Sequence, residues 1–138
     1  IVGIARVESG GSSSRGGTEI TGHDADPFQL DKIGIENTRE NVNLRRWRSW
    51  IDEKRGPKPS NLGSRWDQQS NSEIEGSTAM GAIAATLYVL WANKSWDPEK
   101  RNTYSFPSSV KAQAKFWKKH YNTPSGDGVA QDYIDKNS

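Results

Sequence analysis

Glu8 stands at the end of the apolar segment IVGIARVES, directly before a run of glycine and serine. The spacing of Ile1, Ile4 and Ala5 predicts a short helix that ends near residue 9, with Glu8 in its last turn. A carboxylate is unfavourable there because the helix dipole is negative at that end. Partial burial would raise the pKa of this carboxyl, and a protonated carboxyl can donate to the leaving oxygen of a glycosidic bond. Glu8 is therefore a candidate general acid, the alternative being a solvated helix-end residue.

Two further carboxylates, Asp24 and Asp26, lie in the segment GHDADPFQLDK at residues 22–32. If this segment folds back over the end of the first helix, one of them stands across a cleft from Glu8. In inverting glycosidases a second carboxylate lies roughly 6.5–9.5 Å from the acid and activates a water. The alternative is that both aspartates stabilise turns through their own backbone. The sequence does not rank Asp24 above Asp26.

The motif ESGG, followed after a glycine-rich segment by PFQLDK, resembles the lysozyme-like peptidoglycan glycosidases, namely goose-type lysozymes and lytic transglycosylases. In those families a catalytic glutamate ends a helix in an E-S motif, and a G-x-M-Q-V/I segment follows. This chain departs from them with Pro27 in place of Gly and Phe28 in place of Met. The resemblance implies that Glu8 is the general acid and that Ser9 and Gln29 contact the glycan. Similarity to the goose type also implies that an aspartate of the loop just before the Gln motif holds the attacking water.

Two later segments agree with this resemblance in their order along the chain. STAMGAIAATLYVLW looks like the buried helix of the family, and HYNTPSGDG at residues 120–128 resembles the Y-N-x-G-x-G turn of transglycosylases. By similarity, Tyr121 and Asn122 line the cleft near Glu8, although Thr-Pro here separates the Asn from the first Gly.

The tryptophans divide into two groups. Trp66 and Trp96 lie in polar loops, where an indole face could stack on a sugar. Spacing assigns the other four to core stripes, namely Trp47, Trp50, Trp91 and Trp117. A basic cluster consists of Arg45, Arg46, Arg48, Lys54 and Arg55. It could favour an anionic polymer such as the cell wall, but because it is interleaved with Trp on a helix we interpret it as the solvated face.

The pattern along the chain predicts one mainly α-helical domain over residues 1–138, and the resemblance implies that its fold is α+β lysozyme-like. After the first helix, residues 10–26 predict a loop or small β-hairpin. A second helix begins near Thr38 or Asn41, and residues 55–72 form a long loop. The apolar segment 75–91 is the buried central helix, and Ser108 or Ser109 caps the next one. A turn at 122–128 then leads into a last helix.

Composition limits the partners. The chain has 138 residues, with 19 basic and 17 acidic residues and a formal charge of +2, so nucleic acid is not expected. It has no cysteine, no long apolar run that could span a membrane and no calcium-loop pattern, and we expect neither a metal nor a cofactor. The apolar start without a capping residue predicts that sequence upstream has been removed.

The expected function is hydrolysis of the β-1,4 bond between N-acetylmuramic acid and N-acetylglucosamine in peptidoglycan glycan strands, by a periplasmic or secreted protein. The alternatives are a lytic transglycosylase, a non-catalytic wall-binding module and a structural or interaction domain. The domain would suit a phage lysis protein, a wall-remodelling enzyme or an antibacterial toxin. A toxin would require a cognate inhibitor (immunity) protein that plugs the cleft.

Overall fold

A computed structural model describes residues 1–9, 28–54, 70–75, 77–121 and 128–138 of the chain. Within these ranges every regular element is a helix, which confirms a mainly α-helical protein. The elements are α1 (Val2–Ser9), α2 (Lys32–Glu40), η1 (Val42–Leu44), α3 (Arg45–Lys54), α5 (Asn71–Glu75), α6 (Thr78–Ala92), η2 (Pro98–Thr103), α7 (Val110–Phe116), η3 (Trp117–Tyr121) and α8 (Gly128–Asn137). The segment predicted as a loop or hairpin, 10–26, lies outside the described residues.

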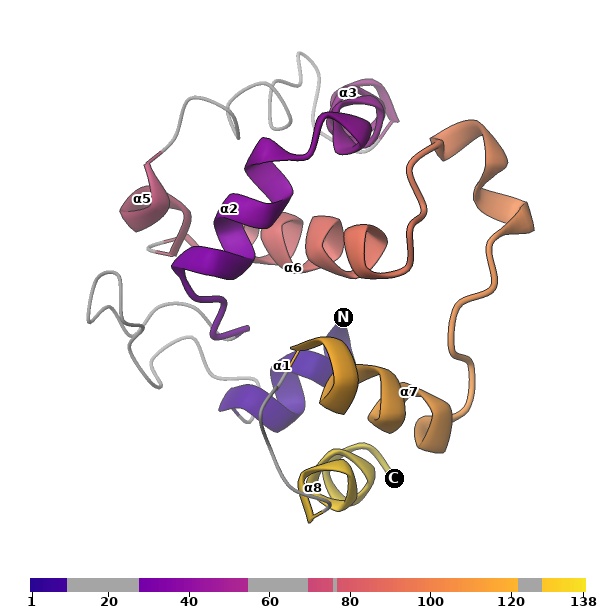
Figure 1. Cartoon of the computed structure of the whole chain (residues 1–138). Coiled ribbons are helices and arrows are strands. Elements are labelled where there is room, and N and C mark those ends of the chain that lie inside the picture. The colour runs from indigo at the N-terminus through magenta and orange to yellow at the C-terminus, as the bar shows by residue number, and fades with distance from the viewer. Residues whose placement is uncertain (10–27, 55–69, 76, 122–127) are drawn as a thin grey trace.

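Helix α6 crosses the middle of the molecule, with α3 and α5 on one side and α1, α7 and α8 on the other (Figure 1). Ser77 caps it by accepting a hydrogen bond from the Met80 amide at 3.3 Å. Ala84, Ala85 and Leu87 are fully buried, and the two small alanines allow neighbouring helices such as α2 and α5 to pack closely against α6. The prediction of a buried central helix is confirmed, with its first residue three positions later than expected.

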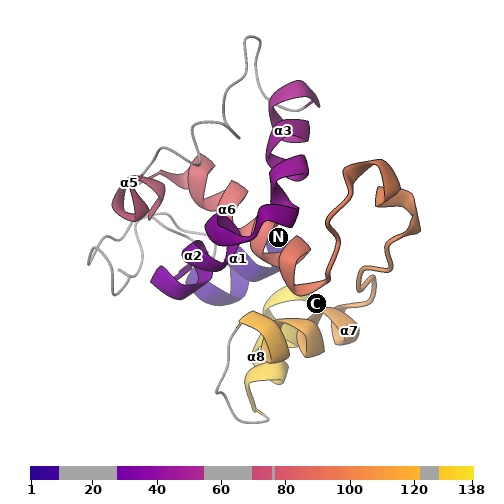
Figure 2. The same ribbon diagram turned by 45° about the horizontal axis from the view of Figure 1, so that its top comes forward.

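A second group of helices joins the two ends of the described chain. Ser109 caps α7 by accepting from the Ala112 amide at 3.1 Å, as predicted, and α7 continues into the π-helical turn η3. Helix α8 packs on both α1 and α7, and these three helices lie together in both views (Figures 1 and 2). Gly3 permits this packing, because a Cβ there would lie 2.2 Å from the Tyr133 hydroxyl of α8.

The structure corrects the sequence interpretation at two helices. Residues 32–40 form α2, which was not predicted, and its N-terminus is capped by Asp31 accepting from the Gly34 amide at 2.8 Å. Thr38 therefore lies inside α2, whereas Asn41 caps η1, which leads into α3. The segment expected to remain a loop up to residue 72 already turns into α5 at Asn71.

Within the described residues, helix α3 confirms that Arg45 and Arg46 are exposed and corrects the interpretation for Arg48 alone, whereas Arg55 lies outside them. Arg48 is buried, and its guanidinium donates to the Thr38 carbonyl at 3.1 Å. Next to it, the buried Trp47 donates its indole N–H to the Ser95 carbonyl at 2.6 Å. Exposed Arg46 forms ion pairs with Asp97 at 3.0 Å and with Glu99 at 3.6 Å. One face of α3 is thus anchored in the core and another to η2.

Candidate functional site

Glu8 occupies the last turn of α1, as predicted, and its side chain is half-buried. The indole N–H of Trp117 donates a hydrogen bond to Glu8 Oε1 at 2.9 Å. Trp117 is itself buried and packs against the Tyr133 ring, with the ring centroids 5.7 Å apart. A rigid donor therefore holds one carboxylate oxygen of Glu8, which restricts the rotamers that the side chain can adopt.

Ser9, the neighbour of Glu8, faces the protein interior. It is 1% exposed, and its hydroxyl donates to the Ala5 carbonyl one turn earlier at 3.1 Å. This back-bonding is the usual way for a helical serine to satisfy a buried hydroxyl. The residue closes the end of α1 against the core, and its contact with a glycan stays a prediction.

The π-helical turn η3 connects Glu8 with the segment that carries Gln29. Trp117 begins this turn and Tyr121 ends it, and residues four apart on a helix have neighbouring side chains, with Cβ atoms about 5–6 Å apart. Tyr121 donates its hydroxyl to the Phe28 carbonyl at 2.6 Å. One helical turn thus contacts both motifs of the resemblance, and π-helical turns are frequent at functional sites.

A pocket of about 320 Å³ opens beside Tyr121. It is lined by Gln29, Leu30, Asp31, Ile33, Gly34, Tyr88 and Tyr121. Gln29 has a φ of 53°, a left-handed conformation that is uncommon for a residue other than glycine. Such backbone strain persists where the surrounding structure enforces it, and it is concentrated at functional sites. The structure therefore brings Gln29 and Tyr121, both predicted site residues, to one pocket.

The hydroxyls in this pocket are held by backbone carbonyls. Tyr88 donates to the His120 carbonyl at 2.5 Å, and its ring meets the Tyr121 ring edge-on at 5.5 Å. Burial raises the pKa of the Tyr88 hydroxyl, and the negative charge of Asp31 raises it further. Tyr88 therefore stays a neutral phenol at physiological pH. With its hydrogen engaged, the Tyr88 phenol oxygen can still accept a hydrogen bond from a ligand.

The other predicted site residues fall outside the described part of the chain. These are the two candidate second carboxylates, the loop tryptophan and the asparagine of the turn: Asp24, Asp26, Trp66 and Asn122. Their proposed roles stay predictions. Trp96 is described, and it is 36% exposed between α6 and η2.

Sequence reasoning missed three residues of the site. It assigned Trp117 to the core, which is correct for the ring. It did not predict that the indole N–H of Trp117 donates to Glu8. It did not single out Tyr88, although a tyrosine in a buried helix needs a partner for its hydroxyl. It named Asp31 only as part of a motif, and here Asp31 both caps α2 and lines the pocket.

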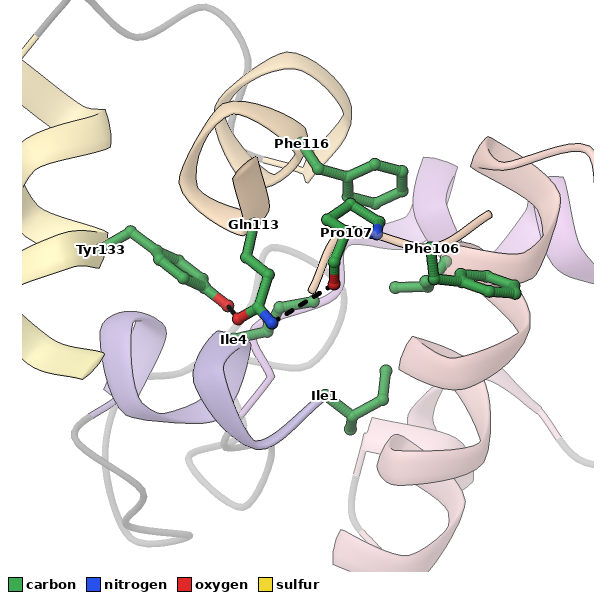
Figure 3. Close-up of a pocket in the computed structure, with 8 residues that line it drawn as sticks. Ile1, Ile4, Phe106, Pro107, Gln113, Phe116 and Tyr133 are labelled. Atoms are coloured by element: carbon green, nitrogen blue, oxygen red, sulfur yellow. Dashed lines mark hydrogen bonds between the residues drawn. The ribbon is translucent and has the colours of Figure 1, made fainter. Parts of the chain in front are cut away.

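A second hollow, of about 270 Å³, lies between α1, α6 and the segment leading into α7 (Figure 3). Its walls are mainly apolar, and its polar groups are bonded to one another. Tyr133 donates its hydroxyl to Gln113 Oε1 at 3.1 Å, and Gln113 Nε2 donates to the Pro107 carbonyl at 3.3 Å. No Asp, Glu, His, Lys or Arg side chain lines it, and burial raises the pKa of its Tyr133 hydroxyl above the usual value.

Within the described ranges, no three side chains of the metal-ligating types gather closely enough to hold a metal ion. Among the same residues, no helix has the length and apolarity needed to cross a membrane. Comparison of the chain with family models, curated proteins and solved structures gives no match.

Proposed function

We propose that the protein is a peptidoglycan glycosidase that cleaves β-1,4 bonds between N-acetylmuramic acid and N-acetylglucosamine, with Glu8 as the general acid. The observation that carries the proposal is the half-buried Glu8 carboxyl held by Trp117 at 2.9 Å. Catalytic acids need a fixed geometry relative to the atom they protonate, and a carboxyl anchored at one oxygen meets that need.

The hydrogen bond also indicates where the proton would reside. In a protonated carboxyl, the oxygen that accepts the indole N–H acts as the carbonyl oxygen. Because Trp117 donates to Oε1, the acidic proton would be carried by Oε2. Protonation of the glycosidic oxygen by Oε2 would accompany cleavage of the C1–O bond. A water directed by Asp24 or Asp26 would then attack the sugar carbon, in the manner of an inverting hydrolase.

The pocket beside Tyr121 supports a sugar as the ligand. It combines a primary amide, a carboxylate and two phenol oxygens with the apolar side chains of Leu30 and Ile33. Amide and carboxylate groups suit the hydroxyl and N-acetyl groups of an aminosugar, and tyrosine rings suit its apolar face. The pocket offers groups that orient a glycan, whereas Glu8 supplies the acid.

The experiment uses purified sacculi and Glu8→Gln, which keeps the shape of the side chain and removes its acidic proton. We expect this variant to release at least 100-fold less soluble glycan than the wild type, since general acid catalysis typically contributes 10²–10⁴-fold. Glu40→Gln is the matched control, because Glu40 is exposed at the end of α2. Full activity of Glu8→Gln would exclude Glu8 as the acid.

Mass spectrometry of the released fragments separates hydrolysis from the alternatives. Reducing ends on muramic acid identify the hydrolase, whereas anhydro-muramyl ends identify a lytic transglycosylase. Binding to sacculi without release of fragments by the wild type would favour a wall-binding module. Periplasmic or secreted action, and inhibition by an immunity protein that covers the site, are further parts of the proposal. Co-purification of a tight periplasmic partner from the native host would support the second part.

A further inference from the structure

The positive charge of the chain is concentrated in one stretch of sequence. Residues 100–126 contain neither Asp nor Glu, and their basic residues are Lys100, Arg101, Lys111, Lys115, Lys118 and Lys119. The whole chain has a formal charge of only +2, so the remainder of the molecule is net acidic. Such charge asymmetry within a chain is typical of a surface that meets an anionic partner.

The structure arranges part of this charge as a row. Lys111, Lys115 and Lys119 follow one another at intervals of four residues along α7 and η3, and all three are exposed. At the α-helical rise of about 1.5 Å per residue, Lys111 and Lys115 lie about 6 Å apart along the axis of α7, and Lys119 follows in the π-helical turn η3. We call these residues the lysine row. The core stripe of the same helix, which includes Ala114 and Trp117, lies on the opposite side of it.

No ion pair neutralises the lysine row within the described part of the chain. The salt bridges found there involve Lys32 and Arg46 instead. The exposed aspartates of the adjacent helix α8 are Asp132 and Asp135, and Asp135 accepts from Gln131 Nε2 at 2.8 Å. The field of the row is felt locally, since the charge of Lys119 adds to burial in lowering the pKa of His120.

We propose that the lysine row binds the carboxylates of the stem peptides of peptidoglycan while the glycan strand occupies the site at Glu8. This inference rests on the proposed function. It adds a binding surface for the stem peptide, for which the site at Glu8 offers no group. The row and the site share one helical segment, because Trp117 and Tyr121 lie between and beyond the lysines in sequence. A helix with its side chains is about 10–12 Å in diameter, so a short peptide on the bound sugar can reach from one side to the other.

Charge complementarity selects the stem peptide over an uncharged partner. Exposed lysines gain little from neutral glycan, whereas each can pair with a carboxylate at a modest and salt-sensitive gain. Three lysines in a row can each pair with a carboxylate, so the binding free energies of the three ion pairs add. The lysine row would then distinguish peptidoglycan from chemically similar strands that lack peptides.

The test measures binding rather than turnover, in a Glu8→Gln background that prevents digestion. Lys111, Lys115 and Lys119 are replaced together by glutamine, and the binding of each protein to purified sacculi is followed by sedimentation at 50 mM and 300 mM salt. We expect binding roughly tenfold weaker at low salt, from about a twofold to threefold loss per lysine. The difference should shrink at high salt.

Two matched variants distinguish the effect of charge at these positions from a disturbed fold and from a change in the net charge of the protein. Arginine at the same three positions keeps the charge and should restore binding. Glutamine at Lys54, Lys94 and Lys100, which are exposed on other elements, removes as much charge and should leave binding within twofold of the parent. Sacculi stripped of their peptides by an amidase should bind the parent and the lysine-row variant equally.

The outcomes distinguish the two proposals. If the parent protein binds sacculi and the lysine-row variant binds equally well, the inference about the row is overturned and the proposed function stands. If the parent does not bind sacculi, the proposed function itself fails. Tighter salt-dependent binding of the row to an oligonucleotide or to anionic vesicles than to sacculi would also overturn the inference, since it would identify another class of partner.

Discussion

Replacing Trp117 by phenylalanine keeps an aromatic ring against Tyr133 and removes the indole N–H that reaches Glu8. A hydrogen bond contributes about 0.5–1.5 kcal/mol to stability when both groups are neutral, as with a protonated Glu8, and about 1.5–3 kcal/mol when one of them is charged. Because Glu8 is only half-buried and solvent screens the pair, we expect a coupling free energy between the two side chains of about 1–2 kcal/mol. The single variant should cost more than this, since it also leaves part of a buried indole site empty.

The measurement is a double-mutant cycle of Trp117→Phe and Glu8→Ala, with the free energy of unfolding obtained from urea titration followed by far-UV circular dichroism. A parallel cycle of Trp47→Phe and Glu8→Ala is the control, because the Trp47 indole donates to the Ser95 carbonyl instead. That control should be additive within about 0.5 kcal/mol. Additivity in the Trp117 cycle as well would refute the argument that this indole positions Glu8.

The remaining predictions concern packing and pH. Gly3→Ala should lower the free energy of unfolding by about 1–3 kcal/mol because its Cβ meets the Tyr133 hydroxyl, and Tyr133→Phe should recover part of that loss in urea titrations. Burial and the charge of Lys119 lower the pKa of His120 below 6.5, so the folded state favours the neutral imidazole. The contribution of this preference to the free energy of unfolding is fully present above pH 6.5 and is lost as the pH falls through the lowered pKa. His120→Gln should therefore flatten the decline of stability between pH 7.5 and 5; an unchanged slope would contradict this.

The helices that the sequence predicted are those with local signals. Ser109 precedes a stripe formed by Val110, Ala114 and Trp117, so the cap and the periodicity agree. Helix α6 is apolar enough to be recognised from composition alone. In both cases, the residues that define the helix are neighbours in sequence.

Helix α2 was missed because its signals are weak or conflicting. Its sequence KIGIENTRE contains a glycine, which disfavours a helix, and its buried residues include Gly34 and Thr38 beside Ile35. The reliable signal was Asp31, which accepts from the amide three residues later. Asp31 is also part of the motif PFQLDK, so one residue fits both a family motif and a helix cap.

The candidate site was predicted at Glu8, Gln29 and Tyr121 from motif order, whereas the contacts between its parts were not. The Glu8–Trp117 hydrogen bond joins residues 109 positions apart, and the Tyr121–Phe28 bond joins residues 93 apart. Such pairs depend on how the helices pack, which no local pattern encodes. The same reason explains Arg48, whose burial depends on a carbonyl of a different helix.

The docking of α1 against α8 fixes the order in which the protein can assemble in a cell. Helix α1 is synthesised before the helices that hold it, among them α8, whose Asn137 Nδ2 donates to the Gly3 carbonyl at 3.1 Å. A helix of eight residues is marginal in water without tertiary partners. The nascent chain therefore cannot fix Glu8 in place until η3 and α8 have been synthesised, and any activity that needs this carboxyl has to wait for those later helices.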